Sequence, residues 1–186
     1  GDNRTKSLEL YERGTYEVWL GKLEEAGQTA EELRRAIESG PDRKLARLYE
    51  GLLGMISFKR HDFAGVEDHI KKALSMTAIE LFGGSTTGFQ RSEFLAYLAD
   101  AYEQAGRWPD ARKTYKEILS LKSPLAWGSA NVLIFVKSHY RLGIVLERLG
   151  DKAGAAAKYR QFLDLWKNAD PGLPEVDDAK KRLSAL

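Results

Sequence analysis

Few residues in this chain have types and spacing that could support chemistry. His61-Asp62 places an imidazole beside a carboxylate, and divalent metal ions accept both as ligands. Such a metal centre needs further His or Asp ligands from other helices, but the only other histidines are His69 and His139. The pair also stands where a helix pair requires a turn, so we interpret Asp62 as an N-cap. The sequence therefore predicts no metal site and no cofactor.

A glycine-rich stretch at 83–88, GGSTTG, has the composition of a phosphate-binding loop. A phosphate loop needs a following Lys-Ser/Thr and a preceding strand, whereas Phe89-Gln90 follow here and no strand is predicted before it. We interpret the stretch as a flexible connection. No cluster of His, carboxylate and nucleophile elsewhere has the spacing of an active site, so we expect no catalytic residue and no enzymatic activity.

Composition excludes several classes of protein. Of the 186 residues 43% are hydrophobic, and 29 Lys+Arg against 27 Asp+Glu leave a formal net charge of +2. A dedicated nucleic-acid binder usually carries a strong basic excess, so we expect no nucleic-acid partner. The longest candidate for a membrane span, 130–136, is far shorter than the about 20 residues that cross a bilayer, so we expect no membrane insertion. The absence of cysteine excludes disulfides and leaves both cytoplasm and periplasm open as compartments.

The stretch 95–121 predicts two amphipathic helices joined by a tight turn. Apolar residues of the first helix recur at i, i+3, i+4 and i+7 and share one face: Leu95, Leu98, Ala99 and Tyr102. Gly106 can take positive φ and end this helix, and Pro109 suits the first turn of the next one. The apolar side of the second helix consists of Ala111, Tyr115, Ile118 and Leu119.

This pattern resembles the tetratricopeptide repeat, a helix pair with the signature W-x2-L-G-x2-Y followed by A-x3-F. The corresponding positions are Leu95 for Trp, Leu98-Ala99 for Leu-Gly, Tyr102 for Tyr, and Ala111-x3-Tyr115 for Ala-x3-Phe. The resemblance implies an all-α fold, a right-handed superhelical stack of antiparallel helix pairs known as an α-solenoid.

Two further copies support the resemblance. A copy that starts at Val136 carries Leu142-Gly143 at the Leu-Gly positions, and a weaker copy that starts at Arg47 carries Leu53-Gly54. Insertions at 78–91 and 123–135 lengthen the connections between copies. We therefore predict one domain over 1–186. Its parts are divergent N-terminal helices in 1–44, repeats at 47–80, 92–122 and 136–168, and a C-terminal capping helix at 174–186.

The first 44 residues fit the repeat only loosely. Gly14 to Tyr16 looks like a turn after a truncated first helix, and the stretch from Tyr16 to Ser39 favours one long helix with a weak point at Gly27. Thr29 with Glu32 three residues later has the spacing of a capping box.

In this family the first helix of each pair lines a groove, and the resemblance implies that the groove here takes an extended segment or helix of a partner. We predict a partner-binding groove formed by Met55, Phe58, Lys59, Tyr97, Asp100, Glu103, Gln104, Lys137, Tyr140, Arg141, Ile144 and Arg148. Some members grip a C-terminal carboxylate with Lys, Asn and Arg. Lys137 and Arg141 match two of those positions and could together bind an anion. Gly51, Met55 and Tyr97 stand where the remaining Lys and two Asn are required, so the full clamp is absent.

Two functions are compatible with these features. The first is a non-enzymatic module that holds a protein or peptide partner. The second is a small-ligand or peptide sensor whose pocket is closed by the inter-repeat insertions. Self-association into a homodimer through an edge helix is a further option. The chain begins with Gly-Asp, and residues 138–176 are similar to C-terminal repeats on multidomain bacterial regulators, so we expect a fragment of a larger bacterial protein.

Overall fold

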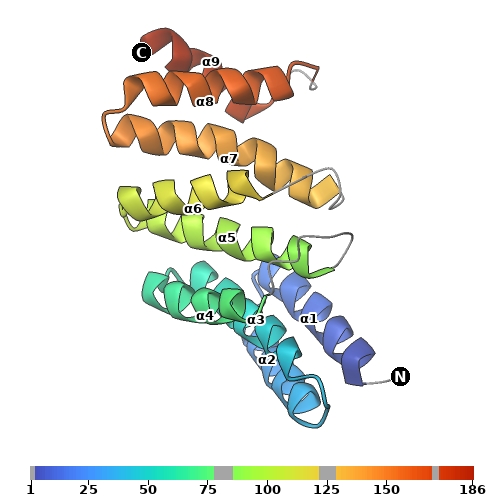
Figure 1. Cartoon of the computed structure of the whole chain (residues 1–186). Helices are drawn as coiled ribbons and strands as arrows, with labels where there is room; N and C mark the ends of the chain where they lie inside the picture. Colours follow the sequence, from blue (N-terminus) through green and yellow to red (C-terminus); the bar gives the residue numbers. More distant parts are fainter. Residues whose placement is uncertain (1–2, 78–85, 122–128, 169–171) are drawn as a thin grey trace. The chain divides into compact units, whose positions relative to one another are not determined.

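The computed structural model describes residues 3–77, 86–121, 129–168 and 172–186, and within these ranges the chain forms helices and turns without a strand (Figure 1). The all-α fold class predicted from the sequence is confirmed. The helices fall into two compact units, 1–80 and 81–186. The single domain expected from the sequence stays a prediction.

The first unit contains two helix pairs. Its elements are α1 (Asn3–Trp19), α2 (Leu23–Glu38), the 3₁₀ turn η1 (Arg43–Leu45), α3 (Ala46–Lys59) and α4 (Phe63–Ser75). Each helix packs on the next, and α1 also packs on α3. This arrangement places the first helices of both pairs side by side, as in a stack of helix pairs.

The second unit repeats this scheme and adds a terminal helix. Its elements are α5 (Thr86–Gln104), α6 (Trp108–Ser120), α7 (Ser129–Arg148), α8 (Lys152–Leu165) and α9 (Pro174–Ala185). The helices pack in chain order, and α5 also packs on α7 (Figure 1). The apolar positions named for the central and third copies lie in the core, since Leu98 and Leu142 are both buried. Leu53 of the first unit is half-buried.

Every helix pair is joined by a three-residue turn, at 20–22, 60–62, 105–107 and 149–151. Turns this short make the paired helices antiparallel. The same position of each turn has positive φ, and it is occupied by Gly21, His61, Gly106 and Gly150. Glycine adopts this conformation without the steric penalty that a side chain brings, which explains why three of the four residues are glycine.

A small residue stands seven positions before each of these turn residues, at Gly14, Gly54, Ala99 and Gly143. A Cβ at Gly54 would lie 2.5 Å from Cδ1 of Ile70, and one at Gly143 would lie 2.5 Å from Cε1 of Tyr159. The first helix of these pairs therefore approaches side chains of the second too closely for anything larger than glycine.

Gly143→Ala is expected to lower the free energy of unfolding. The Tyr159 ring is fully buried and its hydroxyl donates to Glu147 at 2.6 Å, so the ring cannot swing aside to admit a methyl group. Overpacking of this kind costs about 1–3 kcal/mol. It outweighs the gain of up to about 1 kcal/mol that alanine brings to a helix interior. A thermal melt should show a Tm a few degrees below that of the parent protein.

Gly27→Ala is the matched control, because Gly27 lies inside α2 with no atom within 4 Å of an added Cβ. Here only the helix-propensity gain remains, and we expect stability to rise by about 0.5–1 kcal/mol. If the two variants shifted Tm in the same direction, the close approach at Gly143 would not govern its stability.

The structure corrects the prediction for the N-terminal residues. α1 runs straight through Gly14, the turn comes at 20–22, and Gly27 lies within the separate helix α2. The predicted turn at 14–16 and the single helix over 16–39 are therefore wrong. Thr29 lies inside α2 and is not an N-cap: its hydroxyl donates to Glu17 at 2.6 Å and accepts from Arg13. This buried polar contact joins α1 to α2.

The predicted insertions are partly helical. α5 begins at Thr86 and α7 begins at Ser129, so 86–91 and 129–135 extend these helices at their N-terminal ends. The interpretation of 78–91 and 123–135 as loops is wrong for those residues, while 78–85 and 122–128 lie outside the described residues. The extension of α7 carries Leu133 and Ile134 to the site described next.

Candidate functional site

A pocket of about 460 Å³ lies in the second unit between α5, α7 and α9. It is lined by Ala96, Asp100, Tyr115, Leu133, Ile134, Lys137, Ser138, Tyr140, Arg141 and Glu175. Four of the predicted groove residues are in this lining: Asp100, Lys137, Tyr140 and Arg141. The predicted groove did not include the other six lining residues, which are Ala96, Tyr115, Leu133, Ile134, Ser138 and Glu175. Leu133 and Ile134 were missed because they were assigned to a loop, and Glu175 because it was assigned to a capping helix.

A polar cluster joins three residues of the lining, Asp100, Tyr115 and Arg141, to Glu103. The Tyr115 hydroxyl contacts Oδ1 of Asp100 at 2.5 Å and Oε2 of Glu103 at 3.0 Å. The Arg141 guanidinium lies 3.1 Å from Oε2 of Glu103 and 4.0 Å from Oδ1 of Asp100. This cluster ties α5, α6 and α7 together at the pocket.

Burial decides the electrostatics of this cluster. It raises the pKa of Asp100, against the hydrogen bond from Tyr115 and the Arg141 cation. Burial likewise raises the pKa of Glu103, and again Arg141 opposes the shift. The nearby carboxylates add to burial in raising the pKa of the Tyr115 hydroxyl, which therefore stays a proton donor.

The next helix pair has a related arrangement. Tyr159 of α8 donates to Glu147 of α7 at 2.6 Å, and Arg182 of α9 approaches the same carboxylate at 3.0 Å. Glu103 precedes Tyr115 by the same twelve residues that separate Glu147 from Tyr159. This shared spacing is a signal in the sequence that could have revealed both contacts in advance.

Side chains of α9 already engage α7 at the edge of the pocket. Nζ of Lys137 lies 2.9 Å from Glu175, and the Tyr140 hydroxyl donates to Asp178 at 2.7 Å. The hydrogen bond from Lys137 lowers the pKa of Glu175, while burial, followed by the bond to Asp178, raises that of Tyr140 to about 12. Both cations of the hypothetical anion site, Lys137 and Arg141, thus have acidic partners within the chain.

The first-unit residues of the predicted groove do not reach this pocket's lining. Met55 is fully buried, with its sulfur 3.9 Å from the Thr15 hydroxyl, so its side chain belongs to the core. Phe58 is half-buried and Lys59 is exposed.

The remaining predicted residues belong to the second unit but are not part of the pocket lining. Tyr97 is half-buried, and burial raises the pKa of its hydroxyl to about 12. Ile144 is half-buried and Gln104 is exposed. Arg148 lies over the Trp108 ring, 5.4 Å from its centroid.

The residues considered for metal binding occupy separate places. Exposed His61 has a φ of 57°, and Asp62 caps α4 by accepting from the Gly65 amide at 2.9 Å, so the N-cap interpretation is confirmed. His69 contacts Glu50 at 2.7 Å. Within the described ranges no three His, Cys, Asp or Glu side chains are grouped so that they could hold a metal ion. No helix among the described residues has the length and apolarity needed to cross a membrane.

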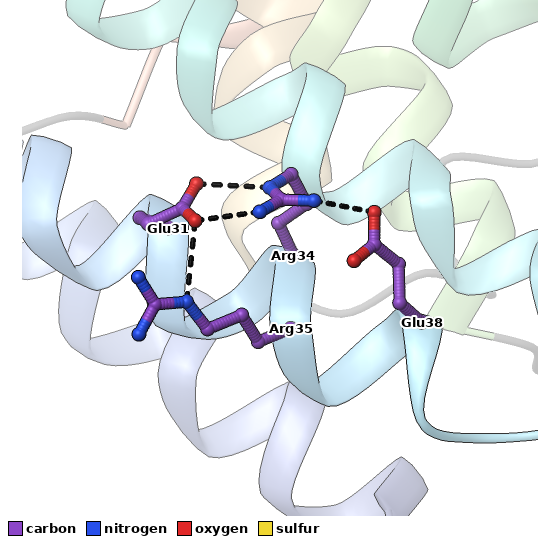
Figure 2. A network of polar contacts seen from close by, with 4 residues as sticks. All are labelled: Glu31, Arg34, Arg35 and Glu38. Atoms are coloured by element: carbon purple, nitrogen blue, oxygen red, sulfur yellow. Dashed lines mark hydrogen bonds and ion pairs between the residues drawn. The ribbon is translucent and has the colours of Figure 1, made fainter.

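A second charged cluster, on α2, is satisfied within its own helix (Figure 2). Glu31 contacts Arg34 at 2.6 Å and Arg35 at 3.2 Å, while Arg34 reaches Glu38 at 2.5 Å. The Arg34 hydrogen bond is the largest effect and lowers the pKa of Glu31 to about 2 against desolvation, while the Arg35 hydrogen bond lowers it further. Exposed pairs three and four residues apart on one helix chiefly support that helix.

Two family models described as tetratricopeptide repeat match the chain, one at residues 78–130 and the other at 137–169. A comparison with curated proteins gives no significant match. The matched residues include most of α5 to α8, whose three-residue turns, glycine turn positions and closely approaching small residues are described above. The chain therefore contains tetratricopeptide repeats across these two stretches.

Proposed function

We propose that the chain is an interaction module whose second unit holds a segment of a partner protein in the pocket between α5, α7 and α9. Tetratricopeptide repeats generally mediate contacts between proteins, and proteins built from them are typically non-enzymatic. To this general role we add the location of the site, which is this pocket, and the kind of occupant, which is a peptide-like segment.

One observation carries the proposal. First helices of two successive repeats, α5 and α7, line a hollow of about 460 Å³ with apolar side chains that remain partly open to solvent. Leu133 is 49% exposed at this hollow, and Ile134 beside it is half-buried. Covering large apolar side chains is the usual source of affinity at an interface, with surrounding polar groups that fix orientation.

Ala96→Trp tests the pocket by filling it, since Ala96 is part of its lining. Peptides selected from a displayed random library on the parent protein would be measured against the variant by fluorescence anisotropy. We expect the indole to occupy the apolar hollow and weaken binding by at least about tenfold, equivalent to about 1.4 kcal/mol.

Ala157→Trp is the matched control, because Ala157 is exposed on α8 and absent from the pocket lining. It should bind the selected peptides as the parent protein does. Leu133→Ala gives a second test that removes apolar area from an exposed position and so spares the core. Unchanged affinity in both Ala96→Trp and Leu133→Ala would place the partner elsewhere.

A small-ligand sensor is the second candidate function. The observation in its favour is the pocket volume, which lies within the range of about 300–1,000 Å³ typical of ligand sites. Native mass spectrometry distinguishes it: a small molecule should stay with the parent protein and be lost from Ala96→Trp. Selection of tight peptides together with an empty parent protein would favour the interaction module.

A further inference from the structure

The charged side chains at the pocket differ in how completely they are paired with opposite charges. Lys137 pairs with Glu175 at 2.9 Å, and Arg141 pairs with Glu103 at 3.1 Å. Asp100 is left with one hydrogen bond at Oδ1, from Tyr115, and its nearest cationic atom is Nε of Arg141 at 4.0 Å. Within the described part of the chain no hydrogen-bond partner lies on Oδ2 of Asp100, whose side chain is 41% exposed. Three carboxylates, those of Asp100, Glu103 and Glu175, thus share the two cations of Lys137 and Arg141. Asp100 is the least neutralised of the three, and it lines the pocket.

Apolar side chains lie in the same pocket. Ala96 of α5 and Leu133 with Ile134 of α7 complete a lining that joins an apolar surface to a carboxylate. Lysine and arginine side chains have the matching form, because each carries a methylene stem and a charged end. An acidic side chain would instead add a negative charge beside an incompletely paired carboxylate, which is unfavourable.

We propose that the pocket receives a lysine or arginine side chain of the partner segment. Its methylene stem lies along Ala96, Leu133 and Ile134, and its cationic end binds Oδ2 of Asp100. This inference rests on the proposed function, since it names the chemistry of the segment that the pocket holds. The proposed ligand has the opposite charge to the anion that Lys137 and Arg141 could bind together, because those two cations are paired within the chain.

The experiment compares three sets of short capped peptides with randomised alanine and leucine flanks. The central residue is lysine in the first set, norleucine in the second and glutamate in the third. Norleucine keeps the stem and removes the charge, so the comparison isolates the contact with Asp100. Binding to the full chain is measured by fluorescence anisotropy. We expect lysine peptides to bind about tenfold more tightly than norleucine peptides, as for a hydrogen bond to a charged group, and glutamate peptides to bind most weakly.

Asp100→Asn should abolish the preference for lysine over norleucine while keeping an acceptor for the Tyr115 hydroxyl. Asp164→Asn is the matched control, because it makes the same change at an exposed position of α8 and should keep the preference. A thermal melt checks that both variants are folded. If Asp100→Asn unfolds the chain, the ratio of the affinities of the parent protein for lysine and norleucine peptides still tests the cation site.

The outcomes separate the two proposals. If norleucine or glutamate peptides bound as tightly as lysine peptides, or if folded Asp100→Asn kept the lysine preference, the cation site would be refuted and the peptide pocket would stand. If peptides of all three sets failed to bind, both the cation site and the peptide pocket would be refuted.

Discussion

Replacing Leu142 by alanine is expected to lower the free energy of unfolding by about 2–5 kcal/mol, the range for removing a fully buried leucine side chain. Leu142 is 0% exposed in α7, next to the tightly packed Gly143. The loss combines the transfer free energy of the removed atoms with the cavity that they leave, because the stacked helices around it can close only partly. A thermal melt should show a Tm lower by several degrees or more.

Leu165→Ala is the control for this change, because Leu165 loses the same atoms from a side chain that is 51% exposed at the end of α8. Its effect should stay within about 0.5 kcal/mol, as for most surface substitutions. A Leu142→Ala melt within about 1 °C of the parent protein would show that α7 does not share a core with its neighbours.

Local sequence signals were enough to place the helix pairs from Ala46 onward. Gly106 and Gly150 mark turns because positive φ favours glycine strongly, and buried Leu98 and Leu142 follow helical spacing. These signals arise from residues only a few positions apart in the sequence. They can therefore be recognised without knowing which residues pack against them in the core. The equivalent turn at His61 is harder to recognise from the sequence, because its φ of 57° is unusual for a residue with a side chain.

The first helix pair was misplaced because glycine has two structural roles in this chain: it forms turns, and it allows close helix packing. Gly21 and Gly14 are both glycines, but Gly21 ends α1 with a φ of 77°, whereas Gly14 lies inside the helix. A Cβ at Gly14 would lie 2.5 Å from Leu52, a residue of α3 far along the chain. The same Cβ would lie 3.2 Å from Thr29 of α2, so contacts with two other helices explain Gly14. One signal was present in the sequence, since Gly14 precedes Ala26 by the same twelve residues that separate Gly143 from Ala155.

Four of the residues that line the candidate site were predicted, but their ion pairs were not. Family positions bring Asp100, Lys137 and Arg141 to one pocket, as a repeat pattern can. The ion pair of Lys137 depends on Glu175, thirty-eight residues further along the chain, and so on the docking of α9. The ion pair of Arg141 depends on Glu103 of α5, thirty-eight residues before it. Periodicity within one helix carries no information about such pairings. Lys137 and Arg141, the two cations that could together bind an anion, are in fact paired within the chain.

The second large effect is expected on acidification, through His139. This residue of α7 is 8% exposed, packs edge to face on Phe135, and has an Nδ1 without a hydrogen-bond partner in the described ranges. Burial, followed by the charge of Lys158, lowers the pKa of His139 to about 4, against a hydrogen bond with Gln161. The imidazole is therefore neutral in the folded protein at pH 7.

An unfolded chain would protonate the same histidine near pH 6.5, its ordinary value. As the pH falls below 6.5 the unfolded state takes up the proton first, so stability declines until the folded state also binds it near pH 4. At about 1.4 kcal/mol for each pKa unit, the full loss is about 3 kcal/mol. Asp100 and Glu103, whose pKa values burial raises, bind protons first in the folded state and therefore oppose this decline, so the comparison with a His139 variant is needed to isolate the imidazole.

Urea unfolding between pH 7.5 and 4.5 measures this decline, and His139→Gln should flatten it by removing the titrating ring. His69→Gln is the matched control: it makes the same replacement at the half-buried partner of Glu50 and should keep the decline. The absolute stability of His139→Gln is not the readout, because glutamine packs differently from imidazole. The readout is the slope of the free energy of unfolding against pH. Parallel curves for His139→Gln and the parent protein would mean that a group other than His139 causes the decline.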